Sequence, residues 1–250
     1  MAHPEHLEKL MAGVDEWNQW KNTHPTVNPD FSNADLGGVN LRGAHLEKAN
    51  FSNAKLGEAK LRNAILVDAK LGCADLTAAD LGEANLVRAD LTKANLAGAR
   101  MSNATLNCAR FAEANLSNAE AQNASFWEAD LHKANLTGAS LNEADLRRAN
   151  LTDTDLSRTI VRNANLGEAN LTRSNVEQTD FSGAELVAAK FEKTKLARAD
   201  LRETDLRAKD LSGADLRNAD LNRRDLTRTV LRGAYLAGAN LEWANLGGVI

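Results

Sequence analysis

The sequence predicts an all-β solenoid that follows a short helical segment, and three observations support this fold class. From Phe31 to Leu246 one central position recurs at every fifth residue, 44 times without a change of register, and it holds a large side chain everywhere except at Ala121. A small residue, mostly Ala, stands two positions before this central position. Neither a helix nor a flat strand keeps a five-residue period on one side. Each repeat must therefore turn a corner, as in a solenoid.

Residues 1–30 do not carry the repeat. Pro4 suits a first helical turn, and Gly13 can split the segment into two short helices. An apolar stripe at spacings of three and four is formed by Leu7, Leu10, Met11, Val14 and Trp17. Pro25 and Pro29 favour an extended connector. We expect residues 1–30 to be a helical cap with its connector and residues 31–250 to be the solenoid, with docking of the stripe on a partner protein as the alternative.

Within one repeat the small residue and the large residue both point inward, since they are two positions apart in extended backbone. The two residues that follow are often Gly, Asn, Ser or Thr, which favour turns. In the form Ala-Asp/Asn-Leu-X-X, over about 220 of the 250 residues, the pattern resembles the pentapeptide repeat family. The resemblance implies a right-handed quadrilateral parallel β-helix with four repeats per coil, about eleven coils in all.

The sequence also contains signs of a twenty-residue coil. One column of that period holds Phe31, Phe51, Phe111 and Phe191, and another holds Asp75, Asn95, Asn115, Asn135, Asp155 and Asn175. We expect the second column to form a hydrogen-bonded ladder from coil to coil.

Three exceptions to the pattern test this scheme. Ala121 replaces a large residue, and the rings of Phe111 and Phe126 are expected to fill the space. Lys209 and Arg224 occupy the inward small position, and we expect their side chains to reach water or the neighbouring Asp210 and Asp225.

Composition favours a cytoplasmic protein. The start lacks a basic segment followed by an apolar run, which argues against a signal peptide. No apolar stretch is long enough to cross a bilayer. Cys73 and Cys108 are 35 residues apart, which places them on different sides of the coil and excludes a disulfide between them.

No catalytic, metal or cofactor constellation is visible. The five His residues lack further clustered ligands, and no Gly-rich phosphate loop is present. An interior packed with Leu and Ala, without long loops, leaves no pocket for a substrate. We therefore expect a protein that is not an enzyme and has no cofactor.

Two surface sites are candidates for binding. Trp127 points outward one coil from Arg147, beside Arg148, and exposed Trp and Arg are typical of binding hot spots. The last coil ends without a capping element, so we expect Leu246, Val249 and Ile250 to contact a second copy of the chain or a partner.

The leading functional hypothesis is a rigid structural scaffold for protein interaction whose partner is unknown. The family resemblance implies an alternative, a DNA-mimicking modulator of DNA gyrase as in the quinolone-resistance pentapeptide proteins. A net charge of only -4 and a slightly basic C-terminal half argue against that alternative. Direct nucleic-acid binding is disfavoured by the mixed charge.

Overall fold

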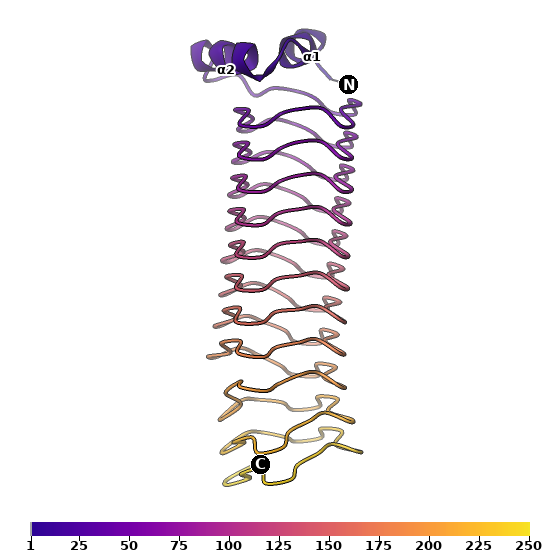
Figure 1. Ribbon diagram of the computed structural model, residues 1–250, viewed down its shortest axis with the longest axis vertical. Helices are drawn as coiled ribbons and strands as arrows, with labels where there is room; N and C mark the ends of the chain where they lie inside the picture. Colours follow the sequence, from indigo (N-terminus) through magenta and orange to yellow (C-terminus); the bar gives the residue numbers. More distant parts are fainter. Residues whose placement is uncertain (1) are drawn as a thin grey trace.

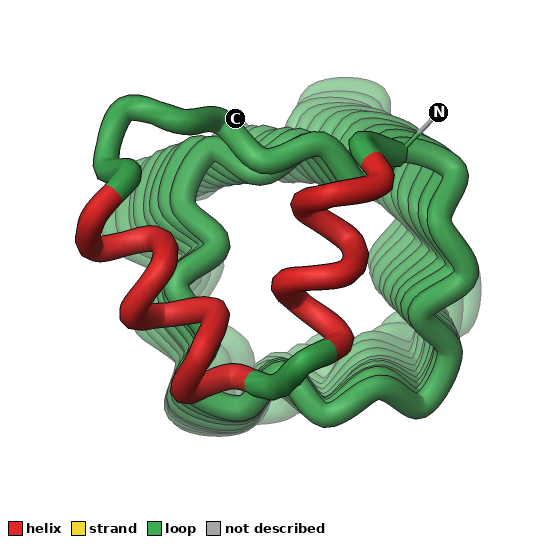
Figure 2. The backbone as a smooth tube through the Cα atoms, turned by 90° about the horizontal axis from the view of Figure 1, so that it is seen from above, coloured by secondary structure: helices red, strands yellow, loops and turns green. Residues whose placement is uncertain are grey.

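The computed structural model describes residues 2–250, which form a long rod closed at one end by two helices, α1 (Pro4–Met11) and α2 (Val14–Thr23) (Figure 1). The rest of the rod is built from single parallel β-bridges, each joining residues twenty positions apart, from Asp30–Asn50 to Asp225–Asn245. An offset of twenty means four repeats per coil, and the end-on view is four-sided (Figure 2). The predicted right-handed quadrilateral β-helix and its short helical cap are confirmed.

Every repeat turns its corner in the same way. The N–H group three residues after the large residue donates back to its carbonyl, as Ala84 does to Leu81 at 3.0 Å. The residue before that donor has a positive φ, and 35 non-glycine residues adopt values between 53° and 62° there. A positive φ at the third residue is the mark of a type II turn, which Asn and Gly tolerate best. The frequent Asn and Gly at this position therefore follow from backbone geometry.

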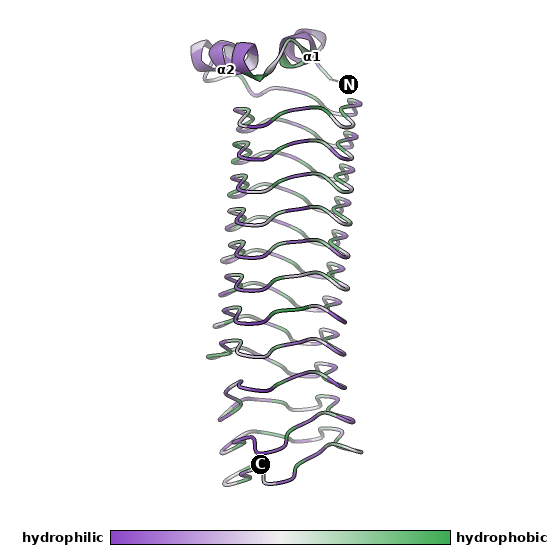
Figure 3. Ribbon diagram, in the orientation of Figure 1, coloured by the Kyte–Doolittle hydropathy of each residue, from purple (hydrophilic) through white to green (hydrophobic). Residues whose placement is uncertain are grey.

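The interior contains only the small and large residues of the repeats, and nearly all are fully buried. Hydrophobic and hydrophilic residues accordingly alternate along each coil (Figure 3). The rings of Phe111 and Phe126 pack with their centroids 5.8 Å apart, in the same coil as the buried Ala121. Five inward Thr hydroxyls donate to a carbonyl of the preceding coil at 2.6–2.8 Å, from Thr154, Thr159, Thr179, Thr194 and Thr229.

The helices close the open end of the first coil. Trp17 is fully buried against Phe31, and its indole N–H donates to the His45 carbonyl at 2.8 Å. The amide of Asn18 accepts from the His45 N–H and donates to the Gly43 carbonyl. The cap therefore satisfies backbone groups that have no preceding coil. Leu10 and Trp17 of the apolar stripe are buried against the core, whereas Met11 is 60 % exposed. Neither helix among residues 2–250 is long and apolar enough to span a membrane.

Lys209 and Arg224 are half-buried. Of the two expected destinations, water or the neighbouring Asp, the ion pair with Asp210 or Asp225 is not formed among the described residues. The Arg224 guanidinium donates to the Asn222 carbonyl at 3.4 Å instead.

Candidate functional site

One side of the rod, which we call the Trp127 face, differs from the others in its outward side chains. It is built from the repeats centred on Leu46, Leu66, Leu86, Leu106, Phe126 and Leu146. Across four successive coils its two outward columns hold no charged residue. This neutral strip consists of Ile65, Val67, Asn85, Val87, Thr105, Asn107, Ser125 and Trp127, all half-buried.

The strip is ordered by its own contacts. The Ser125 hydroxyl donates to the Asn107 side chain at 2.5 Å, and the Asn85 side chain accepts from the Val87 N–H at 3.1 Å. No hydrogen bond from the Trp127 indole N–H to any residue of the described range 2–250 is present. Trp127 therefore offers a partner both an apolar ring and a free donor, the combination for which Trp is favoured at interfaces.

Ion pairs occupy the corner beside the strip. Arg88 holds Asp68 with two bonds of 2.8 Å, and this contact keeps the pKa of Asp68 below its usual range. Arg148 lies between Glu128 and Glu168, at 3.5 and 3.1 Å, which raises the pKa of its guanidinium. Because each charge has a partner within the chain, the corner presents little net field to an approaching molecule.

The structure places the three residues predicted as an interaction patch at one end of the strip. Trp127 belongs to the strip itself, whereas the Arg147 guanidinium binds both oxygens of Asp145 at 2.8 and 2.6 Å. These bonds raise the pKa of Arg147. Arg148 lies in the ion-paired corner. The sequence reasoning missed Ile65, Val67 and Val87, although Val67 and Val87 stand in the same twenty-residue column as Trp127.

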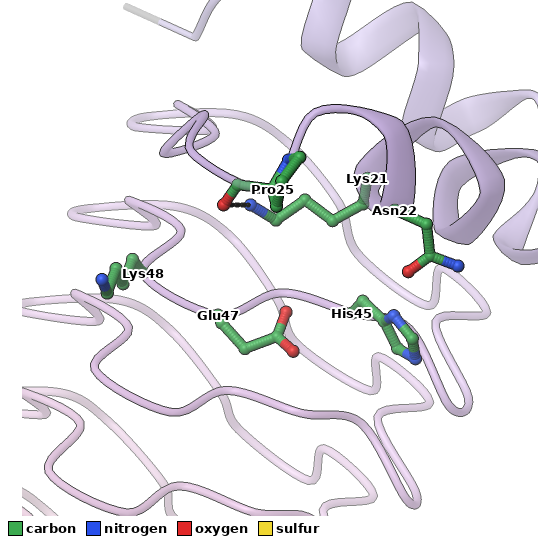
Figure 4. A pocket seen from close by; sticks show the side chains of 6 residues that line it. All are labelled: Lys21, Asn22, Pro25, His45, Glu47 and Lys48. Atoms are coloured by element: carbon green, nitrogen blue, oxygen red, sulfur yellow. Dashed lines mark hydrogen bonds between the residues drawn. The ribbon is translucent and has the colours of Figure 1, made fainter.

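The other end of the strip opens into a hollow of about 300 Å³ beneath α2 (Figure 4). Its walls are Lys21, Asn22 and Pro25 on the helical side and His45, Glu47 and Lys48 on the first coil. Lys21 is fixed there by bonds from its ammonium to the Val27 and Pro25 carbonyls, at 2.6 and 3.4 Å, and burial lowers its pKa. His45 bridges directly to Ile65, so the hollow continues the strip.

The opposite side of the rod carries the charged Asp75, and its other outward residues from Thr77 to Thr137 are small and mostly polar. The expected ladder is present there: Asn115 donates to Asn95 at 3.0 Å and Asn135 donates to Asn115 at 3.2 Å. Ala97 and Thr137 lie at the outward turn positions of this side. The side lacks the apolar anchors of the Trp127 face and provides matched control positions.

The residues expected at an end-to-end contact lie at the last coil. Leu246 is 48 % exposed and Ile250 is 65 % exposed, whereas Val249 is half-buried. Cys73 and Cys108 are both free thiols. Within residues 2–250 there is no group of three or more His, Cys, Asp or Glu side chains that could hold a metal ion.

Comparisons with known proteins agree with this architecture. A family model described as pentapeptide repeats matches residues 30–66, 69–107, 109–148, 149–186, 184–223 and 214–250. No curated protein matches the chain.

Several solved structures are similar. HetL, a pentapeptide repeat protein involved in heterocyst differentiation regulation from the cyanobacterium Nostoc sp. strain PCC 7120, is 30% identical over 93% of this chain and 94% of its own, with a TM-score of 0.39. QnrB1, a plasmid-mediated fluoroquinolone resistance protein, is 18% identical over 74% of this chain and 83% of its own, with a TM-score of 0.48. A pentapeptide repeat protein from the Arabidopsis thaliana thylakoid lumen is 24% identical over 41% of this chain and 64% of its own, with a TM-score of 0.31.

Proposed function

Because the chain belongs to the pentapeptide repeat family, we propose that it is a non-enzymatic scaffold whose Trp127 face binds a partner protein. The observation that carries the proposal is the neutral strip, where apolar side chains and a Trp with a free indole donor stand on a rigid surface. Interface cores are depleted of charge and rich in aromatic anchors, and this strip has both properties.

Rigidity supports the same proposal. The strip is fixed by the β-bridges of four successive coils, so binding of a partner costs this chain little conformational entropy. The hollow under α2 gives the partner a second point of attachment at a defined distance along the rod. We propose that the protein acts in the cytoplasm, as its low cysteine content suggests.

The test uses the chain as bait in its source cell, with quantitative mass spectrometry of what it retains. Val87→Lys places a charge in the strip and should lower the amount of the specific partner that the bait retains by at least tenfold. Two controls should retain it: Val187→Lys, in the same column but 71 % exposed and distant from the strip, and Ala97→Lys on the opposite side. Equal retention by all three variants would refute docking at the Trp127 face.

The gyrase-modulator alternative has less support. In the slightly basic C-terminal half three of the corner carboxylates are paired with Arg residues, in Asp200–Arg202, Asp205–Arg207 and Asp215–Arg217. Such neutralised pairs do not reproduce the continuous negative charge of a duplex. A supercoiling assay is the deciding measurement, since protection or inhibition of gyrase at low micromolar concentration would favour the alternative.

Contact of the last coil with a second copy of the chain stays a prediction. Leu246→Asp and Ile250→Asp should shift sedimentation toward the monomer if Leu246 and Ile250 are buried between copies. A wild-type monomer at high concentration would contradict it.

A further inference from the structure

One repeat interrupts the backbone ladder of the rod. Asp205 is the only residue at the bridging position, from Asp30 to Asn245, without a β-bridge. In intact coils each large residue donates its N–H to the carbonyl nineteen positions later, as Leu166 does to Glu185 at 2.8 Å. Within residues 2–250 no such bond joins Leu186 to Asp205 or Leu206 to Asp225. The repeat around Leu206 is therefore loose toward both neighbouring coils.

The interruption extends to the adjacent sides. Bridges from Lys190 to Asp210 and from Asp200 to Asp220 are also absent from the described ladder, whereas Lys195–Asp215 is intact. Residues 199–210 keep few links to the next coil. These links gather at its C-terminal end: the Ala208 N–H donates to the Thr227 carbonyl at 2.9 Å, the Leu206 carbonyl accepts from the Thr229 hydroxyl at 2.8 Å, and Asp210 keeps its bridge to Val230.

The inward side chains give a physical cause. The hydroxyl of Thr204 donates to Leu201 within its own turn at 2.5 Å, but Ser174 bonds to Leu171 in the same way at 2.7 Å in an intact coil, so this bond is not the cause. Five residues later Lys209 occupies the inward position, where an ammonium group cannot be buried without a partner. The coil must shift outward to let this side chain reach water.

The core shows the effect of this shift. Thr204 is 8 % exposed and Ala189 is 5 % exposed, whereas small inward residues of the earlier coils are almost all at 0–1 %. Behind the loose repeat, Phe191, Leu196, Leu201, Leu206 and Leu211 line a packing gap that is too small to hold a water molecule. Packing and hydrogen bonding are thus weakened at the same place.

We propose that residues 199–210 form a hinge, which opens as a unit while the coils on either side stay closed. Local opening occurs where few hydrogen bonds and imperfect packing hold a segment, at a lower free energy than global unfolding. The hinge divides the rod into one body, residues 31–198, that carries the neutral strip, and a second body, residues 211–250. The intact Lys195–Asp215 side acts as its pivot.

Hydrogen exchange of the full chain, followed by mass spectrometry, tests the hinge. Peptides covering 199–210 should exchange at least tenfold faster than peptides covering 159–170, which occupy the equivalent positions two coils earlier. Lys209→Ala restores a small inward residue and should slow exchange in 199–210. Lys190→Ala, an outward substitution on a neighbouring coil, should leave it unchanged. Equal exchange of the two regions in the wild-type chain would overturn the proposal.

Fast exchange of residues 199–210 could arise from opening of the segment or from amides that lack a hydrogen bond in an immobile segment. A cross-link distinguishes these two explanations. The variant Val187→Cys/Arg207→Cys, in a background where Cys73 and Cys108 are Ser, places one thiol on each side of the loose junction in a single column. Its oxidation should slow exchange across 199–210, and reduction should restore it. The matched pair Val67→Cys/Val87→Cys, at an intact junction, should show no such change near the bond. Fast exchange that persists in the oxidised Val187/Arg207 variant would refute a hinge.

Discussion

Phe126→Ala tests the packing of the solenoid interior most directly. Phe126 is fully buried, contacts Phe111 with centroids 5.8 Å apart, and shares its coil with Ala121, where other coils carry a large residue. Removing the ring leaves a cavity of about 100 Å³, which at about 24 cal/mol per Å³ costs roughly 2 kcal/mol before the lost transfer free energy is added. Because Ala121 offers no atoms to refill the space, the total should lie near the upper end, about 4–5 kcal/mol.

Urea unfolding followed by circular dichroism measures this loss. The control is a compensating pair: Ala121→Leu alone should destabilise by overpacking, whereas Ala121→Leu together with Phe126→Leu should recover most of the stability. A loss below about 1 kcal/mol for Phe126→Ala would refute the idea that the ring fills the space beside Ala121. The same conclusion would follow if the stability changes of Ala121→Leu and Phe126→Leu simply added in the double variant.

Three further measurements address the cap, the inward hydroxyls and the ion pairs. Trp17→Phe removes the indole donor to the His45 carbonyl and should lower the free energy of unfolding in urea by about 1–2 kcal/mol. Trp20→Phe removes no such bond and should lower it by less. Equal losses would contradict the role of the cap bond. Thr179→Val removes the hydroxyl that binds the Leu156 carbonyl and should cost about 1 kcal/mol, against no loss for the outward Thr137→Val. Arg207 lowers the pKa of Asp205 from 3.8 to about 2, so this carboxylate stabilises the fold above pH 4, and its contribution is lost as the pH falls toward 2. Asp205→Asn should therefore show a smaller decrease of melting temperature between pH 4 and pH 2 than the wild type, and identical profiles would exclude the pair as a source of stability.

Much of the fold follows from the sequence because each position of the repeat has one structural role. The five-residue period predicts the four-sided coil, and the inward small residue predicts the burial of the Ala column, as the structure has them. The candidate site was only partly predictable. Val67 and Val87 share a column with Trp127, so the sequence predicts that they lie on one line along the rod. Their half-buried packing depends on the neighbouring coils, which the sequence pattern does not specify.

Other features depend on choices among several partners. Arg147 stands one coil from Trp127 in the same column, which suggested that the two side chains stack. The Arg147 guanidinium instead binds the carboxylate of Asp145, two residues before it in the chain. The hydroxyl of Thr204 selects the carbonyl of its own turn, whereas Thr179 selects the coil before it. The inward Lys209 was visible in the sequence as an exception, but the loss of ladder bonds around it was not.

The twenty-residue offset of the bridges also determines how the molecule would respond to force. The β-bridges join each coil only to the coils directly before and after it, so tension applied to the two ends loads one junction at a time. The chain should unspool coil by coil from an end, and each step should release about 70 Å of extended polypeptide. A force trace would then be a regular sawtooth, with one weak tooth where residues 199–210 leave the stack.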